Sequence, residues 1–207
     1  MIVRQSKEKV NKLLEQNLNW KILDIGCGDR ASEYATDVAD IIDLSNFYKT
    51  KKFTLIKKNQ PFPFKDKEFD FVICSHVIEH VEDINLFIQE LQRISSQGYI
   101  ELPSRLEDNL VFINKTAHLW WFDYNDDEQK LLYDKKYQIL EPVMSVNLCW
   151  EFREKFKESF IIQLYWKNSI DIEKSKLRFQ NINKISRFKV LRKLLSFYIR
   201  GFLKFKN

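Results

Sequence analysis

The sequence predicts an α/β fold with a mostly parallel central sheet and flanking helices, and three observations support this prediction. Short apolar runs alternate with a stretch of helical periodicity between residues 20 and 103, which is typical of parallel strands joined by crossover helices. Four glycines and four prolines in 207 residues are too few for a loop-rich all-β chain. A hydrophobic share of 44%, with 17 phenylalanines, provides enough apolar surface for one sizeable core.

Periodicity and turn residues predict the elements in chain order. Apolar residues recur at helical spacing over residues 5–18 and 77–95, which predicts a helix in each segment. Two prolines make residues 59–68 a loop. The remaining apolar runs are predicted to be strands: residues 20–26, 38–45, 53–58, 69–75 and 97–103.

The rhythm of the chain changes after Pro103. Residues 118–136 have two strand-like halves around a polar turn, which predicts a hairpin, and residues 159–167 predict a further strand. From Lys174 to the end there are 11 lysines or arginines and no acidic residue, which leaves 23 basic against 29 acidic residues in the rest. We therefore expect an acidic domain over residues 1–170 and a basic tail over residues 171–207.

The cysteines and the N-terminal segment indicate the cellular compartment of the protein. Three cysteines, Cys27, Cys74 and Cys149, are widely spaced and odd in number, which argues against a disulfide framework and fits a reducing compartment. The N-terminal segment has no apolar core of signal-peptide length, and no window approaches the roughly 18 apolar residues of a membrane span. The sequence therefore predicts a cytoplasmic protein, and the basic tail adds peripheral contact with the inner membrane face as a further expectation.

A glycine turn suggests a nucleoside-binding edge. The stretch LDIGCGDR places Asp24, Gly26 and Gly28 where a strand should hand over to a helix. Glycines let the backbone approach a ligand, and the first turn of the expected helix would present free N–H groups. Asp43 ends the next predicted strand, where a carboxylate can accept both hydroxyls of a ribose. The third glycine of the dinucleotide pattern is missing, which argues against NAD.

Four motifs occur in order along the chain: LDIGCG, IIDLS, PFPFKDKEFDFVICSHVIEHVEDINLFIQELQRI and GYIELPS. Together they resemble a class I S-adenosylmethionine-dependent methyltransferase of the type 11-like group, over about residues 20–104. The resemblance implies a Rossmann-like fold with S-adenosylmethionine as cofactor. One departure is KKNQ before Pro61, where the family often has an acidic residue at the adenine. The alternative is an α/β protein that has lost its cofactor.

The resemblance also implies where the cofactor binds, position by position. The implied cofactor-binding residues are Asp24, Gly26, Cys27 and Gly28 around the methionine portion, Asp43 and Leu44 at the ribose, Asn59 near the adenine, and Ser75 near the reactive sulfonium.

The histidines of this chain are concentrated after one strand. His76, Glu79 and His80 occupy positions i, i+3 and i+4, so a helix that begins near residue 76 would point all three to one side. The third histidine, His118, follows the next strand by one loop, so every histidine could reach one point above the sheet. Imidazole and carboxylate suit divalent transition metals. The sequence predicts His76, Glu79 and His80 as catalytic residues, and the same three with His118 as metal ligands.

This cluster is similar to metal-dependent O-methyltransferases that carry ExxEH at this place, among them small-RNA 2′-O-methyltransferases and ubiquinone-pathway O-methyltransferases. His76 replaces the first glutamate here, which makes Mn, Fe or Zn better suited than Mg. Two alternatives stay open. A histidine without metal can act as general base, or the EH pair can cap the helix and shape the pocket.

Aromatic and basic segments follow the histidine region. The stretch HLWWFDY suggests a substrate lid, but alternate residues of a hairpin also pack on a core, so we assign Trp121 to the core and leave Trp120 open. The tail predicts a basic amphipathic helix that packs on the body, lies on a membrane surface or binds RNA. Its apolar positions are Ile185, Phe188, Leu191, Leu195, Tyr198, Ile199 and Phe202, and its basic positions are Arg187, Lys189, Arg192, Lys193, Arg200 and Lys204.

These features together predict methyl transfer from S-adenosylmethionine to an oxygen of a small or sugar-like acceptor, with a divalent metal as an assisting ion. GYIELPS with a basic tail resembles methyltransferases of bacterial surface-polysaccharide pathways, which implies a glycan precursor as acceptor. Two alternatives from other classes remain: an RNA 2′-O-methyltransferase, and a non-catalytic methyltransferase-fold protein that serves as partner of another enzyme.

Overall fold

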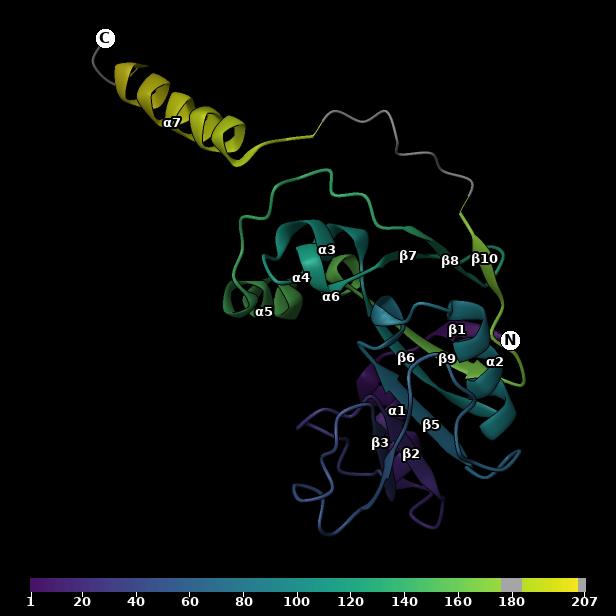
Figure 1. Cartoon of the computed structure of the whole chain (residues 1–207). Coiled ribbons are helices and arrows are strands. Elements are labelled where there is room, and N and C mark those ends of the chain that lie inside the picture. Colours follow the sequence, from purple (N-terminus) through teal and green to yellow (C-terminus); the bar gives the residue numbers. More distant parts are fainter. Residues whose placement is uncertain (176–183, 205–207) are drawn as a thin grey trace.

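The computed structural model describes residues 1–175 and 184–204, with side chains in the last helix described up to residue 199 (Figure 1). The side chains of Arg200, Phe202 and Lys204, which the sequence assigns to the tail helix, lie outside the described part. The strands are β1 (Ile2–Arg4), β2 (Ile22–Ile25), β3 (Asp37–Asp40), β4 (Lys52–Leu55), β5 (Phe71–Ser75), β6 (Gln97–Pro103), β7 (Trp120–Asn125), β8 (Lys130–Lys135), β9 (Ile161–Lys167) and β10 (Ile172–Lys174). The helices are α1 (Lys7–Glu15), the 3₁₀ helix η1 (Ile78–His80), α2 (Ile84–Ile94), α3 (Arg105–Leu110), α4 (Asn114–Ala117), α5 (Val146–Lys155), α6 (Lys157–Phe160) and α7 (Arg187–Lys204).

The larger sheet confirms the predicted central sheet. Its strand order is β1-β9-β6-β5-β2-β3-β4 among the described residues. The five strands from β6 to β4 run parallel to one another, whereas β9 pairs antiparallel with β6 and β1 pairs antiparallel with β9. The sheet is therefore mostly parallel with an antiparallel edge, and the carboxyl ends of its five parallel strands lie at one rim.

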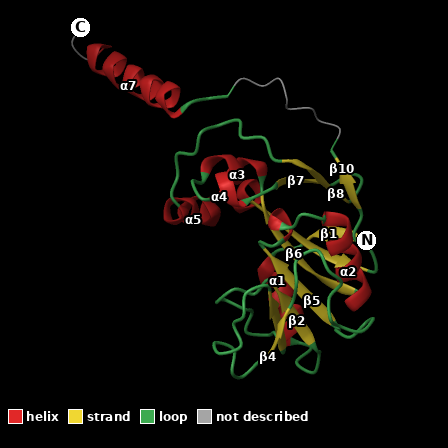
Figure 2. Cartoon of the chain, in the orientation of Figure 1, coloured by secondary structure: helices red, strands yellow, loops and turns green. Residues whose placement is uncertain are grey.

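Both faces of this sheet are buried, because successive side chains of each central strand point to opposite faces. Leu23 and Ile25 pack with α2 and with the smaller sheet, whereas Ile22 packs with Val10 and Leu14 of α1 on the other face. The helices therefore cover the sheet from two sides, as Rossmann-like folds require (Figure 2).

The helix expected after the glycine turn is absent from the described segment between β2 and β3, so that prediction is wrong. Side chains take up the backbone N–H groups that a helix would use for its own hydrogen bonds. The Oδ2 of Asp24 accepts from Ser32 N at 2.7 Å, and the hydroxyl of Tyr48 accepts from Ala31 N at 3.0 Å. The strand expected over residues 38–45 is also shorter than predicted, because β3 ends at Asp40.

The single helix predicted over residues 77–95 is wrong in its first half. The chain forms the short helix η1 and then α2, with residues 81–83 between them. Asp83 starts α2 as a side-chain cap, since its Oδ1 accepts from Leu86 N at 3.0 Å. His76 has a φ of +56°, so the chain turns sharply before η1 and does not enter a helix at residue 76.

The smaller sheet confirms the predicted hairpin. Strands β7 and β8 pair antiparallel, and β10 adds to β8 in parallel. Phe122, Tyr124 and Leu131 of the hairpin pack into the main core. The segment predicted as tail, residues 171–207, thus contributes one strand to this sheet, and it also contains the expected C-terminal helix, α7.

Candidate active site

A cavity of about 240 Å³ opens where the carboxyl ends of the parallel strands meet. Four successive strands each contribute to its wall, with Gly26 after β2, Asp40 at the end of β3, Asn59 after β4 and His76 after β5. We call this space the main cavity. Open parallel sheets bind their ligands at this rim, so the main cavity is where a ligand is expected.

The turn after β2 requires glycine at Gly26. The φ angles of Gly26 and Gly28 are +68° and +51°, in the left-handed region that favours glycine. A Cβ on Gly26 would lie 2.4 Å from Cγ2 of Val77. Only a residue without a side chain lets this turn pack against the loop after β5, and that packing forms part of the cavity wall.

Asp24 lies beneath the glycine turn and holds the segment that follows it. Its side chain is buried, and its Oδ2 accepts from Ser32 N at 2.7 Å. Burial raises the pKa of Asp24 to about 6, although the hydrogen bond from Ser32 opposes the rise. Asp24 does not line the main cavity. Its observed hydrogen bond is with the protein's own backbone.

Asp40 is a cavity residue that the sequence analysis missed. Its Oδ2 accepts from Gly28 N at 2.9 Å and its Oδ1 accepts from Ile42 N at 3.0 Å, so the carboxylate is fixed in the wall of the main cavity. Asp43, the predicted ribose ligand, is exposed, and its Oδ1 accepts from Ser45 N at 3.0 Å. The early end of β3 explains the difference, because Asp40 occupies the strand end at which Asp43 was expected.

The other predicted cofactor residues are divided between the cavity and the core. Asn59 lines the main cavity, where its Nδ2 donates to Glu82 at 2.6 Å. Ser75 is the last residue of β5, and its hydroxyl has no hydrogen-bond partner among the described residues. Cys27 and Leu44 pack in the core on the α1 face of the sheet, so their side chains do not line the cavity.

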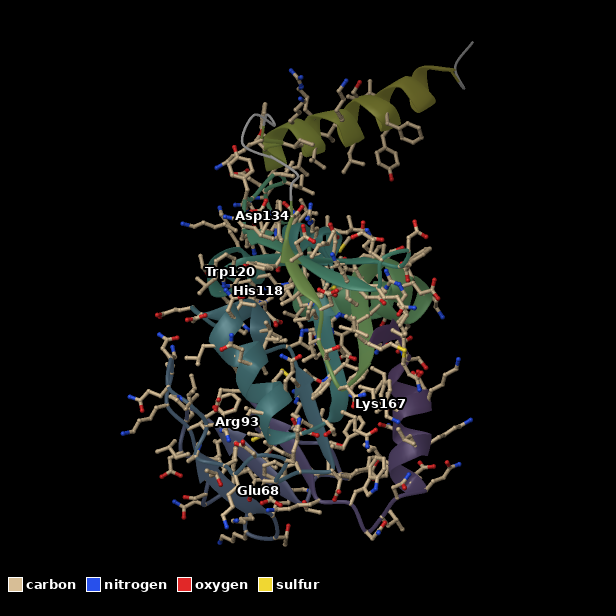
Figure 3. All side chains as sticks on the ribbon, turned by 90° about the vertical axis from the view of Figure 1, so that its right-hand side faces the viewer. Glu68, Arg93, His118, Trp120, Asp134 and Lys167 are labelled. Carbon is tan, nitrogen blue, oxygen red and sulfur yellow. The ribbon has the colours of Figure 1, made fainter. Side chains whose placement is uncertain are left out.

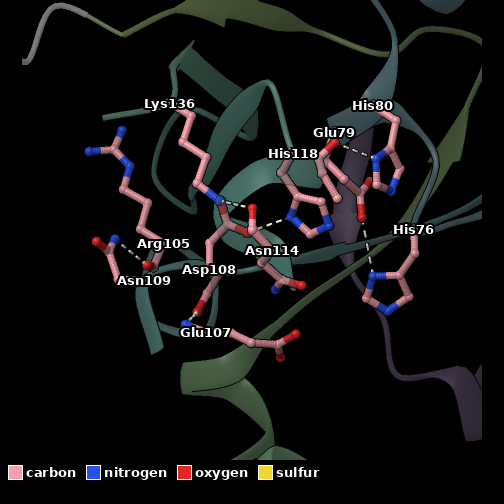
Figure 4. Close-up of polar contacts among 12 residues, drawn as sticks. His76, Glu79, His80, Arg105, Glu107, Asp108, Asn109, Asn114, His118 and Lys136 are labelled. Carbon is pink, nitrogen blue, oxygen red and sulfur yellow. Dashed lines mark hydrogen bonds and ion pairs between the residues drawn. The ribbon is translucent and has the colours of Figure 1, made fainter. Parts of the chain in front are cut away.

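Beside the main cavity, three of the four predicted ligands come together (Figure 4). Glu79, His80 and His118 each offer one ligating atom, and these atoms lie within 4.8 Å of one another. A backbone hydrogen bond brings the segments together, since Leu119 N donates to Glu79 O at 2.8 Å. We call these three side chains the ligand cluster. The rings of its two histidines are 4.7 Å apart between centroids and nearly perpendicular, at 84°.

The hydrogen bonds of the two clustered histidines fix which ring nitrogen is free. Nδ1 of His80 lies 2.8 Å from Ala117 O, and a carbonyl oxygen can only accept, so Nδ1 carries the proton. Nδ1 of His118 bonds the carboxylate of Asp108, which also pairs with Lys136 at 3.1 Å. In the neutral form of each ring, the lone pair therefore lies on Nε2, the arrangement in which a carbonyl or carboxylate orients a histidine for a metal.

His76 lies outside the ligand cluster and contacts two carboxylates. Its Nδ1 is 3.2 Å from Glu79 Oε1 and its Nε2 is 3.5 Å from Glu101 Oε1. Burial opposes charge on the ring, but the contacts with Glu101 and Glu79 outweigh burial and raise the pKa of His76 to about 9. The ring is therefore protonated at neutral pH, and a protonated imidazole has no lone pair with which to bind a metal or accept a proton.

A second cavity, of about 190 Å³, shares His76 with the main cavity and is also lined by His118. Its other walls come from α3, α4, the turn between them and α5. Trp150 of α5 is 51% exposed there. Arg153 forms two hydrogen bonds with the carboxylate of buried Glu107. Because these two charges are paired, and the charged ring of His76 is paired with Glu79 and Glu101, the second cavity suits an uncharged ligand with a ring that can lie on the tryptophan.

The aromatic residues of β7 support the site from outside. Trp121 is buried, as predicted for a core residue. Trp120 is half-buried, and its Nε1 donates to Val81 O at 2.7 Å, which ties β7 to the end of η1. His118 and Trp120 lie on the same side of the molecule, where the smaller sheet meets the body (Figure 3). Trp120 thus helps to hold His118 beside η1.

Comparison with known proteins identifies relatives. A sequence model described as a methyltransferase domain matches residues 3–136. A curated protein of Methanocaldococcus jannaschii, "Uncharacterized protein MJ0638", is 33% identical over 114 residues, which cover 50% of each chain, so this chain spans about half the length of that relative. Among solved structures, PH0226 from Pyrococcus horikoshii is 14% identical with a TM-score of 0.43, covering 77% of this chain and 88% of that one. YcgJ from Bacillus subtilis is 18% identical with a TM-score of 0.37, covering 45% and 51%.

Proposed function

The chain belongs to the methyltransferase domain family, and from this premise we propose that it is a class I S-adenosylmethionine-dependent methyltransferase that acts on an oxygen of a small or sugar-like acceptor. One observation supports the proposal most directly. His76 lines both cavities, His80 lines the main cavity and His118 lines the second. A cofactor in the main cavity and an acceptor in the second cavity would therefore meet at the ligand cluster.

The main cavity has the chemical character that S-adenosylmethionine needs. A carboxylate at the end of the second parallel strand, here Asp40, can accept ribose hydroxyls. Apolar side chains such as Ile56 and Phe87 form part of the same wall, and apolar walls can enclose an adenine ring. The backbone at Gly26 allows close approach of the methionine portion.

Asp40→Asn is expected to weaken S-adenosylmethionine binding about 10- to 100-fold, because hydrogen bonds to a charged group contribute about 1.5–3 kcal/mol. Asparagine also has one acceptor oxygen where Gly28 N and Ile42 N both need one. Titration calorimetry measures the affinity. Asp43→Asn is the matched control and should change it less than about threefold, because Asp43 is exposed away from the cavity wall.

If Asp43→Asn weakened S-adenosylmethionine binding more than Asp40→Asn, the ribose ligand would be Asp43. Absence of heat with the unmodified protein at millimolar S-adenosylmethionine would instead favour the non-catalytic partner protein. Circular dichroism of each variant shows that a loss of binding is not a loss of fold.

The proposed reaction is a displacement at the methyl carbon. The acceptor hydroxyl loses its proton, its oxygen bonds the methyl carbon as the sulfur–carbon bond breaks, and S-adenosylhomocysteine leaves as a neutral thioether. The chain supplies position and a proton acceptor. His80 can take the proton at Nε2, because its Nδ1–H is donated to Ala117 O. The charged ring of His76 cannot accept it.

The ligand cluster also fits a divalent cation. The buried Oε2 of Glu79 has no hydrogen-bond partner among the described residues, and a buried carboxylate oxygen without a partner is costly. Two imidazole nitrogens and one carboxylate oxygen suit Mn, Fe or Zn better than Mg. When bound, such an ion would lower the pKa of an acceptor hydroxyl. Ligation and proton acceptance both use Nε2 of His80, so they are alternatives that the metal content of the protein separates.

The second cavity supports a sugar-like acceptor. The half-exposed indole of Trp150 offers a flat apolar face, and the charged groups of the wall are paired within the protein, Arg153 with Glu107 and His76 with Glu79 and Glu101. Sugar rings stack on such faces while their hydroxyls reach polar groups. The resemblance to surface-polysaccharide methyltransferases agrees with this acceptor class.

Trp150→Ala is expected to raise the KM for a sugar acceptor about five- to tenfold and to change kcat less than about twofold, because stacking positions the ring without touching the transferred methyl group. Methyl glycosides of hexoses and deoxyhexoses serve as acceptors, and transfer of a tritiated methyl group is measured. Leu148→Ala is the control on the same helix, since Leu148 is exposed and does not line the cavity. Equal KM values in both variants would place the acceptor elsewhere.

A further inference from the structure

Helix α7 exposes a long row of apolar side chains. These residues are between 51% and 75% exposed in the folded chain: Phe188, Leu191, Leu194, Leu195, Phe197, Tyr198 and Ile199. Exposed apolar surface of this extent is unusual for a protein that works without a partner. The described part of the helix therefore has a face that the other described residues do not cover.

Most apolar residues of α7 lie on one side of the helix and Lys189 and Lys193 lie on the other, whereas Arg187, at the start of the helix, falls on the apolar side. At about 100° per residue, Leu191, Leu195 and Tyr198 fall on one face, whereas Lys189 and Lys193 fall on the other. The helix contains no acidic residue over its 18 positions. A helix with this division has a hydrophobic face and a basic face without acidic residues, and it needs a partner that satisfies both.

Contact between α7 and the body is confined to the start of the helix in the described residues. Arg187 N donates to Glu141 Oε2 at 2.9 Å, the guanidinium of Arg187 lies 5.7 Å from the centroid of the Phe112 ring, and Ile185 pairs with Leu140. Beyond this point α7 extends away from the body (Figure 1). The acidic body therefore does not cover the apolar face, although its charge is opposite.

We propose that α7 lies on an anionic membrane surface, with its apolar face in the headgroup–acyl boundary and its lysines against the lipid phosphates. Basic amphipathic helices with phenylalanine and leucine on one face bind in this orientation, and each cation near an anionic leaflet strengthens binding about fivefold. Among the described residues no helix is long and apolar enough to cross a bilayer. The helix thus lies in the plane of the membrane.

Two other partners fit α7 less well. RNA would neutralise the cations but would leave Leu191, Leu195 and Tyr198 in water. A second copy of α7 would bury the apolar faces, but it would bring two helices without acidic residues side by side, and no opposite charge would offset their repulsion. An anionic bilayer satisfies both faces at once.

Co-sedimentation of the full chain with lipid vesicles tests this inference. Vesicles of phosphatidylcholine with one quarter phosphatidylglycerol should bind the protein at 50 mM salt, and vesicles of phosphatidylcholine alone should bind it at least about 20-fold more weakly. Leu191→Ser with Leu195→Ser should abolish binding to both. These side chains are exposed in the folded chain, so the substitutions leave the body intact.

A charge-matched pair of variants isolates the contribution of the helix. Lys189→Glu with Lys193→Glu should weaken binding to anionic vesicles at least about 25-fold. Lys9→Glu with Lys12→Glu changes the net charge equally on exposed positions of α1 and should weaken it less than about threefold. Equal losses in both pairs, or equal binding to neutral and anionic vesicles, would overturn the proposal.

The remaining outcomes identify the rejected partners. Binding to an RNA oligonucleotide with no vesicle binding would assign the cations to nucleic acid. A dimer in analytical ultracentrifugation that disappears in the Leu191→Ser, Leu195→Ser variant, without vesicle binding, would assign the apolar face to a second copy. Either result would contradict the membrane proposal.

Discussion

Glu79→Gln is expected to reduce methyl transfer at least about 100-fold and to bring the transition-metal content of the purified protein to background. Glu79 is fully buried and provides the carboxylate oxygen of the ligand cluster. Glutamine keeps the size of the side chain but removes the negative charge that would hold a divalent cation beside His80 and His118. Elemental analysis and a tritiated-methyl assay measure the two effects.

His76→Asn is the matched control for this experiment. Asparagine tolerates the left-handed backbone of residue 76, and His76 lies outside the ligand cluster, so this variant should keep its metal. Added Zn²⁺ or Mn²⁺ should raise the melting temperature of the unmodified protein and of His76→Asn, because a ligand that binds the folded state stabilises it. The added metal should leave the melting temperature of Glu79→Gln unchanged. Equal metal content in all three proteins would end the ion hypothesis and leave His80 as a metal-free base.

Gly98→Ala is expected to lower the free energy of unfolding by about 3 kcal/mol or more, a large share of the stability of an ordinary domain. Gly98 lies in β6 between β5 and β9. A Cβ at this position would lie 2.3 Å from Val72 O and 2.8 Å from Nε1 of the fully buried Trp166. One of these neighbours is backbone, so the strands would have to separate.

Urea unfolding followed by circular dichroism measures this loss. Gly28→Ala is the comparison, since nothing lies within 4 Å of its Cβ position and only its φ of +51° opposes alanine. That variant should cost about 1–2 kcal/mol. A loss below 1 kcal/mol in Gly98→Ala would show that β5 and β9 can move apart without harm to the core.

The sequence predicts the central sheet well because its signals are local. Phe71, Val72, Ile73 and Cys74 are buried alternately on the two faces of β5, and such a continuous apolar run is readable without tertiary information. The same holds for the hairpin β7–β8, whose strands flank a polar turn. Patterns that depend on neighbouring residues thus translate directly into these elements.

The site was harder to predict, because its details depend on contacts between distant segments. The side chains of Asp24 and Tyr48 accept hydrogen bonds from the backbone after the glycine turn, and no helix forms there. The hydrophobic periodicity of this segment does not predict that outcome. Asp40 was missed because the apolar run continues past the end of β3. The pairing of Leu119 with Glu79 across 40 positions of sequence is likewise invisible to any local pattern.

The ligand cluster itself was partly predictable. The chain has three histidines, and the geometry of a parallel sheet predicts that His80 and His118 both lie above its rim. The separation of His76 from them could not be foreseen, because it results from a left-handed residue and from Glu101 on the neighbouring strand. The second cavity was not predicted, since Trp150 and Arg153 reach it from a helix that follows the hairpin.

Strand β9 limits how the chain can be divided. It pairs with β6 along all seven residues of each strand and inserts Leu164 and Trp166 into the core. The segment that matches the methyltransferase domain ends at residue 136, before this strand begins. A fragment that stops there would leave β6 paired only with β5 and its other edge open, and an open edge of this kind invites aggregation with other molecules. The folding unit is therefore longer than the segment that matches the methyltransferase domain.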